Sequence, residues 1–230
     1  MIFSLVIPCF NEAKNIPLVL ESCNFIKTLD KIELILVDNG STDDTQEVFT
    51  KLLPNYPFCK SVRVENNIGY GNGILAGLAV ANGEILGWTH ADMQTDPKDI
   101  LKGLKLFEKN SKEFFIKGRR VERPFGDNIF TFGMSVFESI LLLKPMYDIN
   151  AQPTMFSRSL YNNWKNPPSD FSLDLYAYYS ALKQGYIVRR FQVKFGDRAH
   201  GLSNWNINWK SKLKFIVRTI KYSIKLKKQL

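Results

Sequence analysis

The sequence predicts one α/β domain built on a mostly parallel sheet, and three observations lead to this fold class. The 230 residues are 45% hydrophobic, which suffices for one domain with a substantial core. Short β-rich runs alternate with helical segments at the spacing of βαβ units. The run IELILVD is apolar almost throughout, as expected of a parallel strand that is buried on both faces of its sheet.

The first half of the chain alternates strand and helix. Strands are predicted at 4–10, 32–38 and 62–67, and EILGWTHADMQ is predicted as the fourth. A helix is expected at about 16–28, a second follows the Ser/Thr/Asp-rich turn NGSTDDT, and a third is ILAGLAVA. Right-handed crossovers make such strands parallel.

The second half continues the α/β pattern to about residue 200. A strand enters a basic loop within 112–126, and the Phe-rich segment DNIFTFGMSVFESILLL is predicted as a helix. A turn and strand follow at 148–158, then a helix in SDFSLDLYAYYSALKQG with glycine at its end, and a final strand in YIVRRFQVKFGDR.

Polar and glycine clusters follow the first four predicted strands. In parallel sheets ligands bind beyond the carboxyl ends of the strands. The clusters that fall at that edge contain Asn11, Asp38, the glycines of 69–73, and Asp92. The sequence therefore predicts one ligand site along this edge.

The stretch THADMQTDP carries polar side chains at alternate positions. On an extended chain His90, Asp92 and Gln94 project to the same side, because strand side chains repeat every two residues. Carboxylate and amide oxygens suit Mg²⁺ or Mn²⁺, which can bridge a diphosphate and stabilise it as a leaving group. His90 either ligates the ion, which favours Mn²⁺, or hydrogen-bonds nearby. Asp96 is interpreted as the cap of a helix that starts near Pro97.

Two further signals at this edge are weaker. Asp38 either accepts hydrogen bonds from a base or ribose, or is solvated as the end of a strand. The turn NIGYGNGI has Ile74 where the dinucleotide fingerprint requires its third glycine. Its glycines indicate a tight turn more often than a phosphate cradle.

Taken together, the segments VIPCFNE, ILVDNGSTDDT, NIGYGNGILAGLAVANGEI and ADMQTDP resemble the family-2 glycosyltransferases, which have the GT-A fold. DINAQPTMFSR and FGDRAHGLSNW resemble the branch of dolichyl- and polyprenyl-phosphate sugar synthases. The resemblance extends over roughly residues 3–206 and is more specific for family and fold than for acceptor. We expect a GT-A domain at 1–206 and a basic tail at 207–230.

The resemblance implies roles for the matching residues. Those implied to contact the nucleotide are Pro8, Asn11, Glu12, Asp38, Ser41, Gly69, Gly71 and Ala91. The family's Asp-Ala-Asp stands here as His90-Ala91-Asp92, and Gln94 follows. The implied metal ligands are thus Asp92 and Gln94, with His90 in place of the first aspartate. That replacement leaves the identity and strength of the metal site open, and with them activity.

A basic set in the second half suits an anionic acceptor, because arginine matches phosphate oxygens as a bidentate fork. Its members are Lys117, Arg119, Arg120, Arg123, Arg158 and Arg198. Arg119 and Arg198 match the family's patterns and are predicted to act in catalysis, whereas scattered surface arginine explains some of the others.

The acceptor decides whether a general base is required. A lipid monophosphate, with a second pKa of about 6, is already nucleophilic at pH 7. A sugar hydroxyl requires a base, and the candidates are Asp174 and Asp170. Both are equally explained as helix caps, which is our interpretation of Asp170.

The basicity of the chain belongs to its last residues. Eight of the nine net positive charges lie at 210–230, which holds seven Lys, one Arg and no acid. On a helix, one stripe contains Lys210, Lys214, Arg218, Lys221, Lys225 and Lys228. The adjacent apolar face contains Leu213, Ile216, Val217, Ile220 and Ile224.

Such a basic amphipathic helix lies on anionic membrane surfaces, where each cation contributes roughly 1 kcal/mol. The alternative is that its apolar face packs on the domain or on a second subunit. The segment containing Phe125, Phe130, Phe132 and Phe137 is a further candidate for membrane contact. Apolar runs such as SILLL are shorter than the ~20 residues of a membrane-spanning helix, and three cysteines without metal-ligand spacing fit a reducing cytoplasm.

We therefore expect an inverting, metal-dependent transferase that moves a sugar from a nucleotide diphosphate to a polyprenyl phosphate, peripherally bound at the cytoplasmic membrane face. The alternatives are transfer to a glycan hydroxyl and a degenerate, non-catalytic binder of nucleotide sugars. Nucleic-acid binding is not expected, because the positive charge forms one stripe and no reader module is recognisable.

Overall fold

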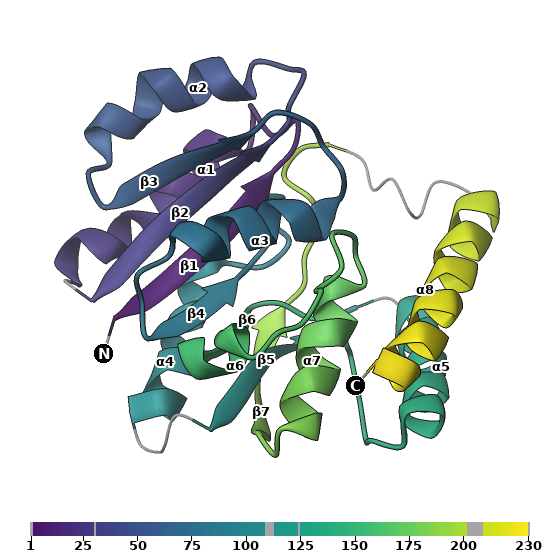
Figure 1. The fold of residues 1–230 in the computed structure, drawn as a ribbon. Helices are drawn as coiled ribbons and strands as arrows, with labels where there is room; N and C mark the ends of the chain where they lie inside the picture. The colour runs from purple at the N-terminus through teal and green to yellow at the C-terminus, as the bar shows by residue number, and fades with distance from the viewer. Residues whose placement is uncertain (1, 30, 109–112, 124, 202–208, 230) are drawn as a thin grey trace.

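The computed structural model describes residues 2–29, 31–108, 113–123, 125–201 and 209–229. The described residues form one seven-stranded sheet of order β3-β2-β1-β4-β6-β5-β7 (Figure 1). The pairs β1–β2, β2–β3, β1–β4 and β5–β7 are parallel, and β6 runs antiparallel to β4 and β5. The strands are β1 (Phe3–Cys9), β2 (Ile32–Asn39), β3 (Cys59–Val64), β4 (Ile85–Trp88), β5 (Phe114–Val121), β6 (Thr154–Ser157) and β7 (Ile187–Lys194).

The sheet carries helices on both faces, and the predicted α/β class is confirmed. The helices are α1 (Ile16–Ser22), α2 (Thr45–Leu52), α3 (Tyr70–Val80), α4 (Ile100–Glu108), α5 (Phe125–Leu142), α6 (Arg158–Asn162), α7 (Leu173–Lys183) and α8 (Trp209–Gln229). Single 3₁₀ turns occur at η1 (Cys23–Thr28), η2 (Leu53–Asn55) and η3 (Pro97–Asp99). The first predicted helix is therefore α1 continued by η1.

The central strands contribute to two hydrophobic layers. In β1, Val6 faces a layer that includes α3, α6 and α7, whereas Leu5 and Ile7 face a layer that includes α1, α2 and α4. All three side chains are fully buried. Burial on both faces explains why these strands read as continuous apolar runs.

The fourth predicted strand is too long in the prediction. It ends at Trp88, because β6 pairs only with Ile85–Trp88. Beyond it the chain bends, with Met93 in the left-handed region at φ 59° and the Gln94 amide donating to Asp92 Oδ1. The expectation that His90, Asp92 and Gln94 alternate on an extended chain is therefore wrong.

Helix α8 lies beside α5 at one side of the molecule (Figure 1). It buries Ser223 and Leu226 completely, while Leu213, Val217 and Ile224 stay exposed. The predicted boundary at 207 lies outside the described residues, and the division into a domain and a tail stays a prediction. Among the described helices, none is both long and apolar enough to cross a membrane.

Candidate functional site

The turns after β1 and β2 are joined by hydrogen bonds at the predicted edge. Asn11 has φ 57°, its backbone amide donates to Ser41 Oγ at 3.0 Å, and its side chain accepts from the Thr42 amide at 2.8 Å. The Glu12 amide donates to Thr45 Oγ1 at 3.0 Å. Residues predicted to line a nucleotide pocket thus form one connected rim.

Asp38 is fully buried at the end of β2. Its Oδ1 accepts from the Ser41 amide at 2.9 Å, and its Oδ2 lies 2.6 Å from Nη1 of Arg63 on the edge strand β3. It is therefore an ordered, paired carboxylate rather than a solvated strand terminus. Arg63 gave no signal in the sequence, because its register opposite Asp38 follows only from strand pairing.

The turn after β4 is held by the segment after β7. Arg198 Nη2 lies 3.0 Å from Asp92 Oδ2, and the Ala199 amide donates to the Asp92 carbonyl oxygen. The Gln94 side chain donates to the Gly196 carbonyl at 3.1 Å, and the Gly196 amide donates to the Gln94 carbonyl. Arg198 is thereby brought to two other predicted site residues, Asp92 and Gln94, from which it is distant in sequence.

Glu12 belongs to the same cluster. Burial, and less strongly the charge of Asp92, raise the pKa of its carboxyl above the ordinary value, while the hydrogen bond from Asn15 and the charge of Arg198 oppose the shift. The cluster therefore contains carboxyl groups close enough to disfavour each other's charge, which attracts a cation to this edge.

His90 sits under aromatic cover. Its ring lies 5.4 Å from that of Tyr70, which stacks in turn on Phe171 at 4.7 Å and 11°. Burial lowers the pKa of the imidazole, although Asp92 and Asp174 oppose the shift. The imidazole is therefore neutral at pH 7 and retains a nitrogen lone pair that can accept a proton or a metal ion.

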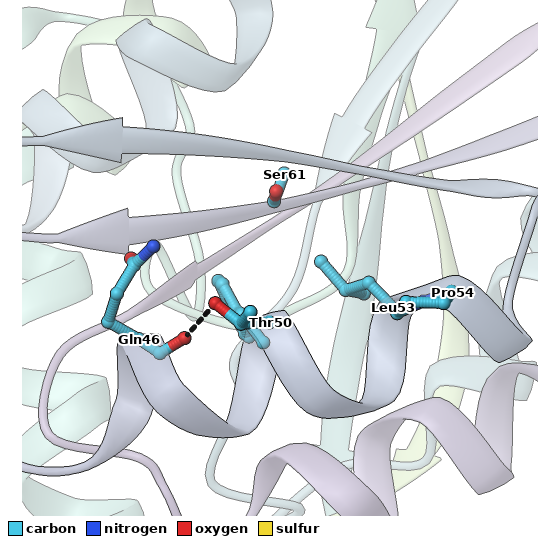
Figure 2. Close-up of a pocket in the computed structure, with 6 residues that line it drawn as sticks. Gln46, Thr50, Leu53, Pro54 and Ser61 are labelled. Carbon is cyan, nitrogen blue, oxygen red and sulfur yellow. Dashed lines mark hydrogen bonds between the residues drawn. The ribbon is translucent and has the colours of Figure 1, made fainter.

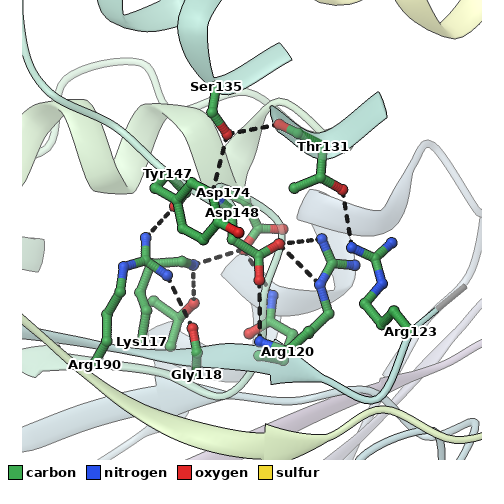
Figure 3. A network of polar contacts seen from close by, with 12 residues as sticks. Lys117, Gly118, Arg120, Arg123, Thr131, Ser135, Tyr147, Asp148, Asp174 and Arg190 are labelled. Atoms are coloured by element: carbon green, nitrogen blue, oxygen red, sulfur yellow. Dashed lines mark hydrogen bonds and ion pairs between the residues drawn. The ribbon is translucent and has the colours of Figure 1, made fainter. Parts of the chain in front are cut away.

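A buried ion pair joins β5 to α7 (Figure 3). Lys117 Nζ is 3.7 Å from Asp174 Oδ1, and the two side chains are 0% and 2% exposed. The same Oδ1 accepts from Gln152 at 2.7 Å and from Trp88 at 3.3 Å. Burial lowers the pKa of Lys117 to about 8, against the opposing charge of Asp174. Asp174 Oδ1 is thus engaged with three buried partners.

The arginines at the end of β5 and just after it differ in environment (Figure 3). Arg120 forms an ion pair with buried Asp148, and its guanidinium lies 5.2 Å from the Phe195 ring centre. Arg123 lies 5.3 Å from the same ring and donates to Thr131 at 2.9 Å. Arg119, the predicted residue, is exposed. Within the described residues, Arg123 Nε is buried without a hydrogen-bond partner.

Burial and the neighbouring charge of Arg120 lower the pKa of Arg123 below its ordinary value. Two guanidinium groups therefore share the Phe195 ring, and the carboxylates of Asp148 and Asp127 both oppose the pKa shift of Arg123. Neighbouring guanidinium groups such as those of Arg120 and Arg123 can bind the oxygens of an anion. The signal in the sequence was the run of arginines, but nothing in it distinguished Arg120 from Arg119.

Gly69 and Gly71 have a packing role in the structure. A Cβ on Gly69 would lie 2.4 Å from the Ser169 carbonyl oxygen, and one on Gly71 would lie 2.7 Å from those of Asp170 and Pro168. Gly69 also has φ 137°. The loop before α7 therefore requires glycine at both positions, and their predicted contact with a nucleotide stays a prediction.

Figure 2 shows a cleft of about 250 Å³ between α2 and the edge strand β3. Its lining includes Phe49 and Leu53, with Gln46 and Ser61 at its polar side. Gln46, which lines the cleft, also accepts from Arg63 at 2.9 Å, so the cleft adjoins the Arg63–Asp38 pair.

Residues 4–167, more than half of the chain, match the family model described as Glycosyl transferase family 2. The chain belongs to this family. The resemblance inferred from the spaced motifs is therefore confirmed, as is the GT-A type of fold.

Two relatives are named for polyprenyl-phosphate substrates. The dolichyl-phosphate beta-glucosyltransferase of Trichomonas vaginalis is 31% identical over 52% of this chain and 40% of its own length. The dodecaprenyl-phosphate galacturonate synthase of Rhizobium johnstonii is 30% identical over 51% of this chain and 36% of its own. The matched regions thus span less than half the length of these relatives.

Solved structures share the fold at low sequence identity. Glucosyl-3-phosphoglycerate synthase from Mycobacterium tuberculosis, in complex with Mn²⁺ and UDP, has a TM-score of 0.72 and 18% identity, covering 98% of this chain and 79% of that one. A mannosyltransferase from Pyrobaculum calidifontis in complex with GDP-Man and Mn²⁺ has a TM-score of 0.69 and 20% identity, covering 97% and 64%.

The side chains at the donor edge include possible ligands for a divalent ion. Among the described residues, no three His, Cys, Asp or Glu side chains converge as a complete metal cage. The donors at the edge are the Asp92 carboxylate, which is 4% exposed, and the neutral His90 two residues earlier. This set fits an ion that takes one or two protein ligands and completes its shell with phosphate oxygens and water. The side-chain amide of Gln94, a predicted metal ligand, donates to the Gly196 carbonyl oxygen instead of facing such an ion.

Proposed function

We propose that the chain is an inverting glycosyltransferase that moves a sugar from a nucleotide diphosphate to a polyprenyl phosphate at the cytoplasmic face of a membrane. The observation that carries the proposal is the ion pair of Asp92 and Arg198 at the carboxyl edge of a family-2 glycosyltransferase sheet. The relatives named for polyprenyl-phosphate substrates support the acceptor class.

The donor would lie along the edge formed by the turns after β1, β2 and β4. The buried Asp38 would act on the base or ribose side through Ser41 and Arg63, which it holds in place. Arg198 offers donors to the diphosphate. Asp92, with His90 beside it, would hold Mg²⁺ or Mn²⁺. Such an ion neutralises charge on a departing diphosphate.

The acceptor phosphate would bind between the donor edge and the start of α5. An acceptor oxygen attacks the anomeric carbon from the face opposite the diphosphate, so that a C–O bond forms as the bond to the diphosphate breaks. The electron pair leaves with the diphosphate. Arg120 and Arg123, whose guanidinium groups lie over the same Phe195 ring, would orient the attacking phosphate.

The burial of Asp174 favours a phosphate acceptor over a glycan hydroxyl. A hydroxyl acceptor requires a general base within hydrogen-bond reach of it. The Asp174 side chain is 2% exposed and engaged with Lys117, Gln152 and Trp88. A phosphate dianion at pH 7 needs positioning but no base.

Exposed apolar side chains on α5 and α8 support attachment to a membrane. We call this set the apolar face: Ile129, Phe132, Val136, Ile140 and Leu143 at α5, and Leu213, Val217 and Ile224 on α8. Lys221, Lys225, Lys227 and Lys228 on α8 are exposed beside it. Apolar side chains with flanking cations match an anionic lipid surface.

Transfer of label tests the proposal. Purified protein is mixed with a panel of UDP- and GDP-sugars, undecaprenyl or dolichyl phosphate in phosphatidylglycerol vesicles, and Mn²⁺ or Mg²⁺. We expect lipid-linked sugar with one donor, and a loss of about 100-fold or more in Asp92→Asn. Asp96→Asn is the matched control, because Asp96 accepts from Ser22 Oγ and the Lys98 amide as a helix cap. Absence of lipid product with every donor, or full turnover of Asp92→Asn, contradicts the proposal.

A further inference from the structure

One guanidinium group and three aromatic rings, from four separate segments, lie one after another in space between α8 and the donor edge. The Arg218 guanidinium of α8 lies 5.6 Å from the centre of the Phe171 ring. Phe171 stacks on Tyr70 with centres 4.7 Å apart and planes at 11°. Tyr70 lies 5.4 Å from the ring of His90, with planes at 33°. We call this set the Arg218–His90 stack.

The loop that carries Phe171 is packed directly on the start of α3. The Asn72 amide donates to the Ser169 carbonyl oxygen at 2.8 Å, and the close approach leaves no room for a Cβ on Gly69 or Gly71. Tyr70 is the first residue of α3 and accepts from Gln152 at 3.4 Å through its hydroxyl. Displacement of the loop would therefore move Tyr70 and free the ring of His90.

Helix α8 holds this loop at two places. Arg218 Nε lies 3.6 Å from Asp170 Oδ2, beside its contact with Phe171, and the Gln229 side chain donates to the Lys165 carbonyl oxygen at 2.9 Å. Asp170 also accepts from the Ser172 amide through Oδ1 at 2.8 Å, which orders the start of α7. A member of the predicted lipid-binding stripe thus contacts the domain.

We propose that Arg218 is a positioning residue for the donor site, acting through Phe171 and Tyr70 on His90. The inference rests on the proposed function, because it assigns His90 to the site of the nucleotide sugar. The packing of α8 on this loop holds Arg218 over Phe171 and thereby keeps His90 oriented. Donor binding is therefore coupled to the position of α8.

The coupling can be measured without any turnover. The chain has two histidines, so the Cε1–H region of its imidazole ¹H–¹³C spectrum holds two resonances, and His200→Gln identifies the one from His90. The stacked ring of Tyr70 displaces the His90 resonance by its ring current. At one fixed pH, we expect Arg218→Ala to move this resonance toward the free-imidazole position, Phe171→Leu to do the same, and Arg218→Lys to move it less.

The matched control is Lys221→Ala, which removes one charge from the same helix. We expect Lys221→Ala to weaken binding to phosphatidylglycerol vesicles, and Arg218→Ala to weaken it less, because Arg218 is already engaged with Phe171 and Asp170. Arg218→Ala alone should shift His90 and raise the KM for the nucleotide sugar about 2- to 5-fold. Arg218→Ala combined with Phe171→Leu should raise KM no further, because both act on one path.

An unmoved His90 resonance in Arg218→Ala, or an equal shift in Lys221→Ala, overturns the inference. Additive effects of the two substitutions on KM would overturn it as well. If no donor gives product, the proposed function fails, and the spectra still decide whether Arg218 orients His90. Thermal unfolding of each variant verifies that it is folded.

Discussion

The guanidinium of Arg198 lies 3.0 Å from the carboxylate of Asp92, which joins the segment after β7 to the turn after β4. In the free protein this contact compensates a carboxylate that is 4% exposed. Under the proposed function, the guanidinium would serve the diphosphate and Asp92 a divalent ion once a donor is bound.

Replacement of Arg198 should impair both fold stability and transfer. We expect Arg198→Ala to lower kcat/KM for the nucleotide sugar about 100-fold, because a preorganised donor to the leaving group is lost. The free energy of unfolding should fall by about 1–3 kcal/mol, since a buried carboxylate loses a partner. Steady-state kinetics and urea denaturation measure the two effects. Arg198→Lys keeps the charge but loses the bidentate guanidinium, so its kcat/KM should lie between those of Arg198→Ala and the unsubstituted chain. If Arg198→Ala has the same kcat/KM as the unsubstituted chain, Arg198 does not act on the leaving group.

The apolar face predicts a lipid-binding phenotype. Phe132 is 61% exposed and Ile140 70% exposed on α5. Aspartate at either position should lower the partition coefficient onto phosphatidylglycerol vesicles at least about tenfold, because apolar burial is replaced by charge repulsion. Co-sedimentation measures this. Leu18→Asp is the control, because Leu18 is 41% exposed on α1, which packs on the opposite layer. Unchanged binding of both α5 variants would exclude this face.

The buried pair of Lys117 and Asp174 predicts non-additive stability. Lys117→Met alone should lower the free energy of unfolding by about 3–5 kcal/mol, because it leaves Asp174 buried without its ion-pair partner. Asp174→Leu alone should be similarly harmful. The double variant should recover most of the loss, since both charges are then absent. Urea denaturation of the four proteins measures the coupling, and losses that simply add would show that the two groups do not act as a pair.

Glu138 predicts a pH dependence in the packing of α5 against α8. Its carboxyl is 0% exposed and accepts from Ser223 Oγ at 2.7 Å, and burial raises its pKa from 4.5 to about 7. A raised pKa of an acid means that the folded state holds its proton longer than the unfolded state. Stability should therefore fall as pH rises from about 4.5 to 7.

Glu138→Gln should remove that pH dependence. We expect a higher melting temperature than that of the unsubstituted chain at pH 8, and little difference at pH 4.5, where the carboxyl is protonated in the folded state and about half protonated in the unfolded state. Scanning calorimetry at the two pH values measures this. Glu65→Gln, on an exposed turn, serves as control. A gap of equal size at both pH values would contradict the assignment.

Much of the fold could be predicted because each local pattern agrees with its tertiary setting. The apolar run of β2 is buried on both layers, and Asp96 caps η3 as expected. The end of β4 could not be predicted, since the length of its antiparallel partner β6 decides it. Periodicity does not reveal how long a neighbouring strand is.

The sequence by itself determined the class of fold, the family, and the edge where Asn11, Asp38 and Asp92 gather, because the alternation of strands and helices and the spacing of motifs can be read along the chain. Only the tertiary structure decided that Arg198 pairs with Asp92, that Arg120 rather than Arg119 enters the polar cluster, and that Asp174 is buried against Lys117. These pairings depend on which segments pack together and on how much contact with water each side chain loses as a result. Arg218 illustrates the difference: its helical spacing indicated a lipid stripe, but packing brought it over Phe171.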